Sequence, residues 1–171
     1  MFKRSVQHLE SNNILNTAQF GFWKEFHIDD AVFIILNNII TSLDQRKHVG
    51  GIFCDLTMAF DCVNHNILLN KLRYYGIRET SLSWFKSYLE NRKQRVCLRP
   101  DIHDQETSSE WEEIVNGVPP GSILGPLLFI IYVNDLPYGL HQGNKPVMYA
   151  DDTSVLLTAD NDAELKTKTM C

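Results

Sequence analysis

The sequence MYADDTSVLL, Met148 to Leu157, places two adjacent acids inside an otherwise apolar run. Neighbouring carboxylates repel each other, and an unpaired buried carboxylate is costly to keep ionised. Aspartate is common in tight turns, so the run predicts a hairpin with strands over 147–150 and 154–157 and with Asp151 and Asp152 at its turn. The acids therefore form a polar turn, or they are compensated by solvent, basic groups or a metal ion.

A third acid, Asp55, stands near the end of HVGGIFCDL (48–56), which is typical of a short buried strand. If this strand lies next to the hairpin, Asp55 comes close to Asp151, with Asp152 alongside. Three carboxylates without a thiolate or imidazole partner suit a hard, oxygen-preferring cation, Mg²⁺ or Mn²⁺. Two such ions support phosphoryl transfer. On these few residues alone, a polar turn remains the simpler interpretation.

Helical patterns surround these strands. Apolar spacing and capping residues predict helices over about 29–44, 64–75 and 126–135, a further helix starting at Thr80 or Ser81, and a last helix in the tail from Asp160. The first of these helices is expected to have one buried face, made of Val32, Ile35, Leu36, Ile39, Ile40 and Leu43. Residues 93–99 are a strand candidate that could pair with 112–117. Helices interspersed with strands predict an α+β domain, with helices packed on one face of a sheet.

Length and composition predict one globular domain. The chain has 171 residues, of which 44% are hydrophobic, and this suffices for a core. The longest apolar run, Ile123 to Val133, is too short to span a bilayer, and no apolar signal segment follows Met1. These features favour an intracellular, soluble protein without a membrane partner. The cysteines lack zinc-site spacing and predict buried or incidental thiols; they are Cys54, Cys62, Cys97 and Cys171.

Charge is distributed unevenly along the chain. The net charge of −5 argues mildly against nucleic-acid binding by the surface as a whole. Between residues 64 and 99, however, basic side chains prevail, and Arg92, Lys93 and Arg95 could contact nucleic-acid phosphates. From charge alone, solvated helix faces are the favoured explanation of this basic stripe.

Five segments of the chain resemble one known family. They are NNILNTAQFGF (12–22), FCDLTMAFDCVNHNILLNKLRYYGI (53–77), SWFKSYLENRKQRV (83–96), GVPPGSILGPLLFIIYVNDLP (117–137) and YADD (149–152). In this order they resemble the reverse transcriptase domain of non-LTR (LINE-type) retrotransposons, in particular the jockey-like elements of insects. YADD alone would be a weak signal, but the ordered set is specific and covers nearly the whole chain.

The resemblance implies a right-hand polymerase fold, with part of the fingers over about 1–50, mostly palm over about 51–171, and no thumb. An antiparallel palm sheet would pack on helices. Asp55, Asp151 and Asp152 match the family's catalytic acids, which bind two Mg²⁺ ions, with Mn²⁺ as a substitute. An RNA template, a DNA primer and dNTPs are the implied partners. The nucleus is the implied location of a complete element, and no oligomeric state is implied.

Other positions match family residues around the nucleotide. Phe60 matches the aromatic residue that excludes a 2′-hydroxyl, and Gly121 matches the glycine that lets the backbone approach template and nucleotide. An ordinary core Phe and a loop glycine are the alternative interpretations. Lys24 lies where it could partly replace a missing arginine, and Tyr149 could support the primer end or belong to the core.

Several family positions are altered in this chain. Trp23 replaces an arginine associated with the incoming triphosphate, and indole offers one donor and no charge. Pro120 replaces a glutamine that contacts the nucleotide–template pair, and proline offers neither a side-chain hydrogen bond nor a backbone N–H. Glu25 replaces a glycine, and Met58 a common lysine. We expect an RNA-directed DNA polymerase domain with little or no synthesis of its own; the alternative is a catalytically dead or co-opted remnant that binds RNA.

Overall fold

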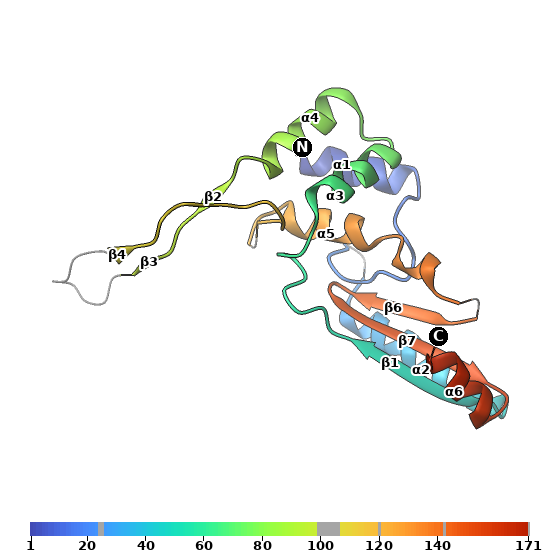
Figure 1. The fold of residues 1–171 in the computed structure, drawn as a ribbon. Coiled ribbons are helices and arrows are strands. Elements are labelled where there is room, and N and C mark those ends of the chain that lie inside the picture. The colour runs from blue at the N-terminus through green and yellow to red at the C-terminus, as the bar shows by residue number, and fades with distance from the viewer. Residues whose placement is uncertain (24–25, 99–106, 120, 142, 171) are drawn as a thin grey trace.

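The chain combines an antiparallel sheet, α-helices and a slender two-stranded arm (Figure 1). The computed structural model describes residues 1–23, 26–98, 107–119, 121–141 and 143–170. The sheet contains, in spatial order, β1 (His48–Cys54), β7 (Asp152–Ala159) and β6 (Lys145–Tyr149). The helices are α1 (Phe2–Ser11), α2 (Ile28–Asp44), α3 (His65–Tyr74), α4 (Glu79–Leu89), α5 (Gly125–Val133), the 3₁₀ helix η1 (Leu136–Gly139) and α6 (Asp162–Met170). The arm pairs β2 (Lys93–Gln94) with β5 (Glu112–Glu113), and β3 (Cys97–Leu98) with β4 (Thr107–Ser108).

β6 and β7 form the predicted hairpin, and β7 lies between β6 and β1. The strand that precedes Asp55 is therefore a neighbour of the hairpin, which meets the condition for the acids to come close. The prediction that this strand is buried is wrong, because each residue of β1 is exposed or half-buried. The strand boundaries differ from the prediction, because β6 and β7 are longer and only Ala150 and Asp151 stand between them. Ala150 adopts the left-handed conformation, with φ of 59°. Asp152 is consequently the first residue of β7 rather than part of the turn.

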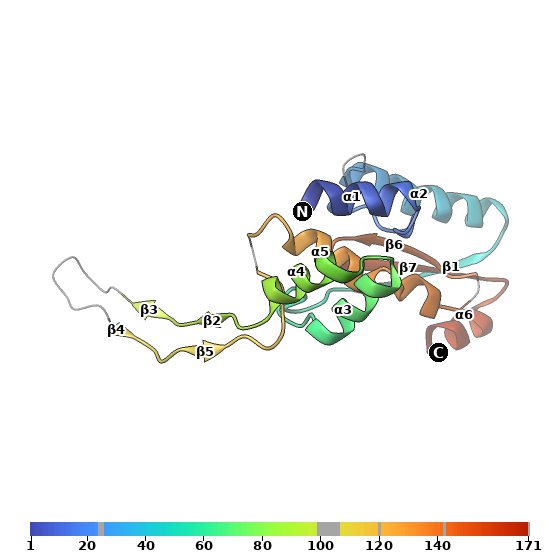
Figure 2. The same ribbon diagram turned by 90° about the horizontal axis from the view of Figure 1, so that it is seen from above.

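Helices cover both faces of the sheet, so the predicted one-sided packing is wrong (Figure 2). On one face, Val147 of β6 shares a buried cluster with Ala31 of α2. On the other face, a Cβ added at Gly50 would lie 3.3 Å from the side chain of Leu165 of α6, so this leucine packs directly over the glycine. The sheet is a thin layer between α2 and α6.

The main core surrounds α5, which is apolar on all sides. Phe129, Leu128 and Ile131 of this helix are at most 1% exposed. α3 contacts both α4 and α5, and Phe85 of α4 and Leu68 of α3 are fully buried in the same cluster. Met148 of β6 joins that cluster, so the sheet and the helical layer share one core.

The predicted buried face of α2 is only partly right, because Ile35 and Ile39 are half-buried whereas the other four predicted residues are exposed. Leu36, Ile40 and Leu43 are 52%, 58% and 57% exposed. Ala31 and Ser42 are the buried residues of the helix instead, and Ile34 and Ile35 pack partly against the sheet. Because α2 carries apolar residues on two faces, their spacing could not decide which face meets the sheet.

The remaining boundaries follow local chemistry. α3 begins after Asn64, whose side chain accepts a hydrogen bond from the Ile67 backbone N–H at 3.1 Å. The cap of α2 is His27 rather than an aspartate, and the Asp30 carboxylate accepts a hydrogen bond from the His27 backbone N–H at 2.7 Å. The predicted pairing of the arm strands is confirmed in part, because Lys93 lies opposite Glu113, whereas Cys97 and Leu98 of the same predicted strand pair with residues 107–108.

Of the two alternatives predicted for the cysteines, the structure favours incidental thiols over buried ones. Cys54, Cys62 and Cys97 are free and exposed, and Cys171 lies outside the described residues. Within the part of the chain that the structure describes, no helix is long and apolar enough to cross a membrane.

Candidate active site

Two of the candidate acids lie at the same end of neighbouring strands. β1 ends at Cys54, which pairs with Thr153 of β7. Asp55 follows Cys54 and Asp152 precedes Thr153, so the antiparallel register brings both acids to one edge of the sheet. Asp151 occupies the adjoining turn. Asp55 and Asp152 are exposed and Asp151 is half-buried, so water relieves much of the repulsion between the carboxylates.

The three acids do not form a closed metal cage. Among residues 1–23, 26–98, 107–119, 121–141 and 143–170, no three histidine, cysteine, aspartate or glutamate side chains gather closely enough to hold a metal ion. The acids nevertheless offer only oxygen donors, which are the ligands that Mg²⁺ and Mn²⁺ prefer. The oxygen donors therefore fit a hard divalent cation. In this structure, however, the three side chains are too far apart to surround an ion together.

A buried glutamine forms hydrogen bonds with the backbone of the hairpin turn. Gln19 is 6% exposed, and its side-chain oxygen accepts hydrogen bonds from the backbone N–H groups of Ala150 at 3.1 Å and of Gly21 at 2.8 Å. Its amide nitrogen donates to the Ala150 carbonyl at 3.4 Å. The segment around it also pairs with β6, because the Phe20 N–H donates to the Met148 carbonyl at 2.8 Å. The loop after α1 thus fixes the backbone next to Asp151.

Gly21 allows this close approach. A Cβ at this position would lie 2.1 Å from the Ala150 backbone nitrogen and 2.9 Å from its Cα, and both are backbone atoms that cannot turn aside. Only glycine therefore fits between the loop and the hairpin. Neither Gln19 nor Gly21 was singled out by sequence reasoning, although both belong to the QFGF stretch that contributed to the family resemblance.

One pocket brings together three of the predicted site residues. It has a volume of about 570 Å³ and is lined by both Phe60 and Gly121 together with Asp151. The other lining residues are Phe22, Leu56, Met58, Ala59, Asp61, Pro119, Ser122 and Pro126. None of these described lining residues carries a positive charge.

The Phe60 ring is held in place by two other aromatic rings. It stacks on Phe129 of α5, with ring centroids 4.7 Å apart and an interplanar angle of 26°. Phe22 meets it edge to face, with centroids 6.0 Å apart. Phe60 therefore belongs partly to the core and also lines the pocket, so the two interpretations of this residue are compatible.

Gly121 is required by its backbone conformation rather than by close packing. Its φ is +73°, a region that favours glycine, and a Cβ added there would meet nothing within 4 Å. The exposed glycine leaves open space at the pocket rim. Pro120, next to it, and Lys24 and Glu25 lie outside the described residues.

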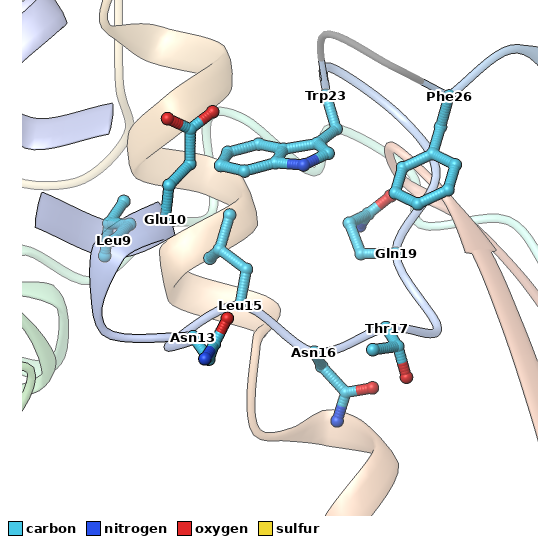
Figure 3. A pocket seen from close by; sticks show the side chains of 9 residues that line it. All are labelled: Leu9, Glu10, Asn13, Leu15, Asn16, Thr17, Gln19, Trp23 and Phe26. Carbon is cyan, nitrogen blue, oxygen red and sulfur yellow. The ribbon is translucent and has the colours of Figure 1, made fainter. Parts of the chain in front are cut away.

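Trp23 faces a different cavity. It lines a pocket of about 400 Å³ between the end of α1 and the following loop. There the indole extends toward Glu10 and Leu15, whereas Phe26 points toward Gln19 (Figure 3). Trp23 is not among the residues that line the pocket beside Asp151. The two pockets are adjacent through Gln19, which lines the first and bonds to the hairpin.

Tyr149 packs in the core cluster between α2 and the sheet. It is half-buried against the cluster of Phe20, Ala31 and Val147. Across the hairpin it pairs with Asp152. The core interpretation of Tyr149 accounts for these contacts.

The predicted basic residues Arg92, Lys93 and Arg95 lie at the base of the arm, which extends away from the rest of the molecule (Figure 1). Lys93 is exposed and stands opposite Glu113 across the strand pair. The Arg95 guanidinium lies 4.8 Å from the centre of the Trp111 ring. Glu113 offsets part of the positive charge of the arm, and the Trp111 ring covers the Arg95 guanidinium.

Comparison with known proteins identifies the family. A family profile described as reverse transcriptase (RNA-dependent DNA polymerase) matches residues 2–170. This chain belongs to the reverse transcriptase family. The acids at the sheet edge and the pocket beside them thus lie in a reverse transcriptase domain.

Several Drosophila proteins are similar to this reverse transcriptase domain. The probable RNA-directed DNA polymerase from transposon BS of Drosophila melanogaster is 30% identical over 164 residues, covering 89% of this chain and 17% of that protein. The RNA-directed DNA polymerase from mobile element jockey of Drosophila funebris is 32% identical over 162 residues, covering 91% and 17%. The putative 115 kDa protein in type-1 retrotransposable element R1DM of Drosophila melanogaster is 30% identical over 150 residues, covering 88% and 14%. The chain spans about a sixth of the length of these relatives, and the domain is homologous to the polymerases of non-LTR retrotransposons.

Proposed function

We propose that this domain carries the nucleotidyl-transfer centre of an RNA-directed DNA polymerase. The observation that carries the proposal is the single pocket lined by Phe60, Gly121 and Asp151, next to the sheet edge where Asp55 and Asp152 lie. A dNTP in this pocket would place its triphosphate toward the acids and its sugar toward the Phe60 ring. In this arrangement residues from about 51 onward act as palm and residues up to about 50 as part of the fingers.

Asp55, Asp151 and Asp152 are the proposed ligands of two Mg²⁺ ions, for which Mn²⁺ can substitute. The ions, when bound, would activate the primer 3′-hydroxyl and stabilise the leaving pyrophosphate. Two of the three side chains are exposed at the ends of strands, so rotation about their side-chain bonds can draw the carboxylates together. Gln19 would keep the turn that carries Asp151 in place during this rearrangement.

Phe60 is the proposed selector for deoxynucleotides. Its contact with Phe129 limits the movement of the ring, so a 2′-hydroxyl at the sugar would collide with it. Gly121 would let the backbone approach the nucleotide. Lys24 is proposed to contact the triphosphate, and Tyr149 and the arm residues Arg92, Lys93 and Arg95 to contact an RNA template or DNA primer. A complete protein of this kind would act on these partners in the nucleus.

Primer extension tests this function. The purified chain would be incubated with an RNA template, a DNA primer, dNTPs and Mg²⁺, beside its Asp151→Ala variant. We expect little or no extension by the native chain, and we expect whatever extension it shows to be lost in the variant. Extension that persists in Asp151→Ala would contradict the assignment of the acids.

A second candidate function is a catalytically silent module of the same fold that binds RNA. It is favoured by the absence of any lysine or arginine among the described residues that line the pocket, since a triphosphate needs positive charge nearby. The double variant Trp23→Arg with Pro120→Gln separates the candidates. Extension gained only in this variant would show that these substitutions silenced the centre, whereas RNA binding without extension in any version would support the second candidate.

A further inference from the structure

Helix α2 presents a broad apolar stripe to solvent. The side chains of Val32, Phe33, Leu36, Ile40 and Leu43 are between 48% and 65% exposed. The opposite side of the helix rests on the sheet through Ala31 and the residues around it. A helix that is apolar on two faces is normally covered on both, and contiguous exposed apolar surface marks sites of association. We therefore expect the outer face of α2 to be a surface at which the chain associates with another molecule.

The spacing of the stripe fits another helix as the partner. Val32, Leu36, Ile39 and Leu43 follow one another at intervals of four, three and four residues, which is the a and d pattern of a helix pair. Phe33 lies beside this seam and widens it. With 17 residues, α2 offers about two heptads, so the association is expected to be of moderate strength.

Charges at the two ends of α2 define the orientation of the partner. Asp29 and Asp30 lie in the first turn. Asp44 is the last residue of the helix, and Arg46 and Lys47 follow it, so this end keeps one net positive charge. Two such helices placed side by side in the same direction would bring like charges together. In the antiparallel arrangement, the acidic end of each helix meets the basic end of the other, and the helix dipoles are also opposed.

We propose that a second copy of this chain docks on α2, with the two helices antiparallel and related by a two-fold axis. A two-fold axis midway along the stripe, between residues 37 and 38, places Leu36 of each copy opposite Ile39 of the other, and Val32 opposite Leu43. It also places Asp29 and Asp30 at the basic end of the facing helix. The contact is self-complementary, so it closes as a dimer. It uses no residue of the proposed polymerase centre and stands independently of that function.

Sedimentation velocity over a range of protein concentrations tests the dimer. The native chain of 171 residues is expected to show a concentration-dependent dimer. Leu36→Glu places a charge in the centre of the seam and is expected to raise the dissociation constant at least about 30-fold, as for a central interface residue. Val115→Glu changes an exposed apolar residue next to β5, 69% exposed against 52% for Leu36, and is expected to leave the dimer unchanged. Circular dichroism of each variant confirms that it remains folded.

A charge exchange tests the orientation. Asp29→Arg and Arg46→Asp are each expected to weaken the dimer, and the double variant is expected to restore it, because opposite charges then meet again. A native chain that stays monomeric would overturn the proposal and leave the stripe to another protein or segment. A dimer that resists Leu36→Glu, a continuous series of larger species, or a double variant weaker than both single variants would also overturn it.

Discussion

The side-chain oxygen of Gln19 accepts a hydrogen bond from the backbone N–H of Ala150 at 3.1 Å, across 131 positions of sequence. The same oxygen accepts from the Gly21 N–H. A single buried side chain thereby connects the loop after α1 to the turn that carries Asp151. The position of this acid depends on a residue from the other end of the chain.

Replacement of Gln19 by alanine is expected to destabilise the fold by about 2 kcal/mol. The change leaves the N–H groups of Ala150 and Gly21 buried without their acceptor, and each such group costs about 1–3 kcal/mol when uncompensated. Urea unfolding measures the difference in the free energy of unfolding. Gln7→Ala, at an exposed position of α1, is the matched control and should change stability by less than about 0.5 kcal/mol. Equal stability of both variants would show that Gln19 does not hold the turn.

Gly21→Ala is expected to distort the hairpin. The added methyl group would lie 2.1 Å from the Ala150 nitrogen, so the loop must move away from the turn. Such overpacking typically costs about 1–3 kcal/mol. Gly139→Ala is the control, because a Cβ there meets nothing within 4 Å. Thermal melts should show a lower melting temperature for Gly21→Ala than for the native chain and an unchanged melting temperature for Gly139→Ala. A larger decrease for Gly139→Ala than for Gly21→Ala would refute the close approach.

Asn134, next to the end of α5, is expected to be the most sensitive polar residue of the main core. It is 4% exposed, and its side chain accepts from the Asn16 N–H at 2.7 Å and donates to the Ile14 carbonyl at 2.9 Å and to the Tyr75 hydroxyl at 3.1 Å. Asn134→Ala should cost about 2–3 kcal/mol, since buried partners lose their bonds. Tyr75→Phe removes only one of these bonds and should cost about 1 kcal/mol. Chemical unfolding of both variants measures the order, and a larger loss for Tyr75→Phe would contradict it.

The stability of the domain is expected to fall in alkaline solution partly through Tyr75. Burial raises the pKa of its hydroxyl above the ordinary value of 10.0, while the hydrogen bond from Asn134 acts in the opposite direction. The folded state therefore keeps this proton at pH values where the unfolded chain has lost it. The contribution of this hydroxyl to the free energy of unfolding is fully present below pH 10 and is lost as the pH rises through the folded-state pKa. In unfolding measured against pH, Tyr75→Phe should show a shallower decline above pH 10 than the native chain; identical slopes would exclude Tyr75 as a cause.

Sequence reasoning succeeded where a local pattern determined the structure. The hairpin and the neighbouring strand before Asp55 follow from apolar runs that end in acids, and the pairing of Lys93 with Glu113 follows from two short strand candidates. The orientation of α2 could not be predicted, because the helix is apolar on two faces. The role of Gln19 could not be predicted either, because its partners are distant in sequence and a glutamine carries no periodic signal.

The proposed polymerase centre requires that the acids beside the pocket bind a divalent cation together with a nucleotide. Electron paramagnetic resonance of Mn²⁺, titrated into the chain with a dNTP present, measures this most directly. The account predicts saturable binding that weakens about tenfold or more, equivalent to about 1.4 kcal/mol, in Asp151→Asn. Asp44→Asn, which removes the same charge from the exposed end of α2, should leave the affinity unchanged. Equal Mn²⁺ affinity of the native chain and Asp151→Asn would contradict the account.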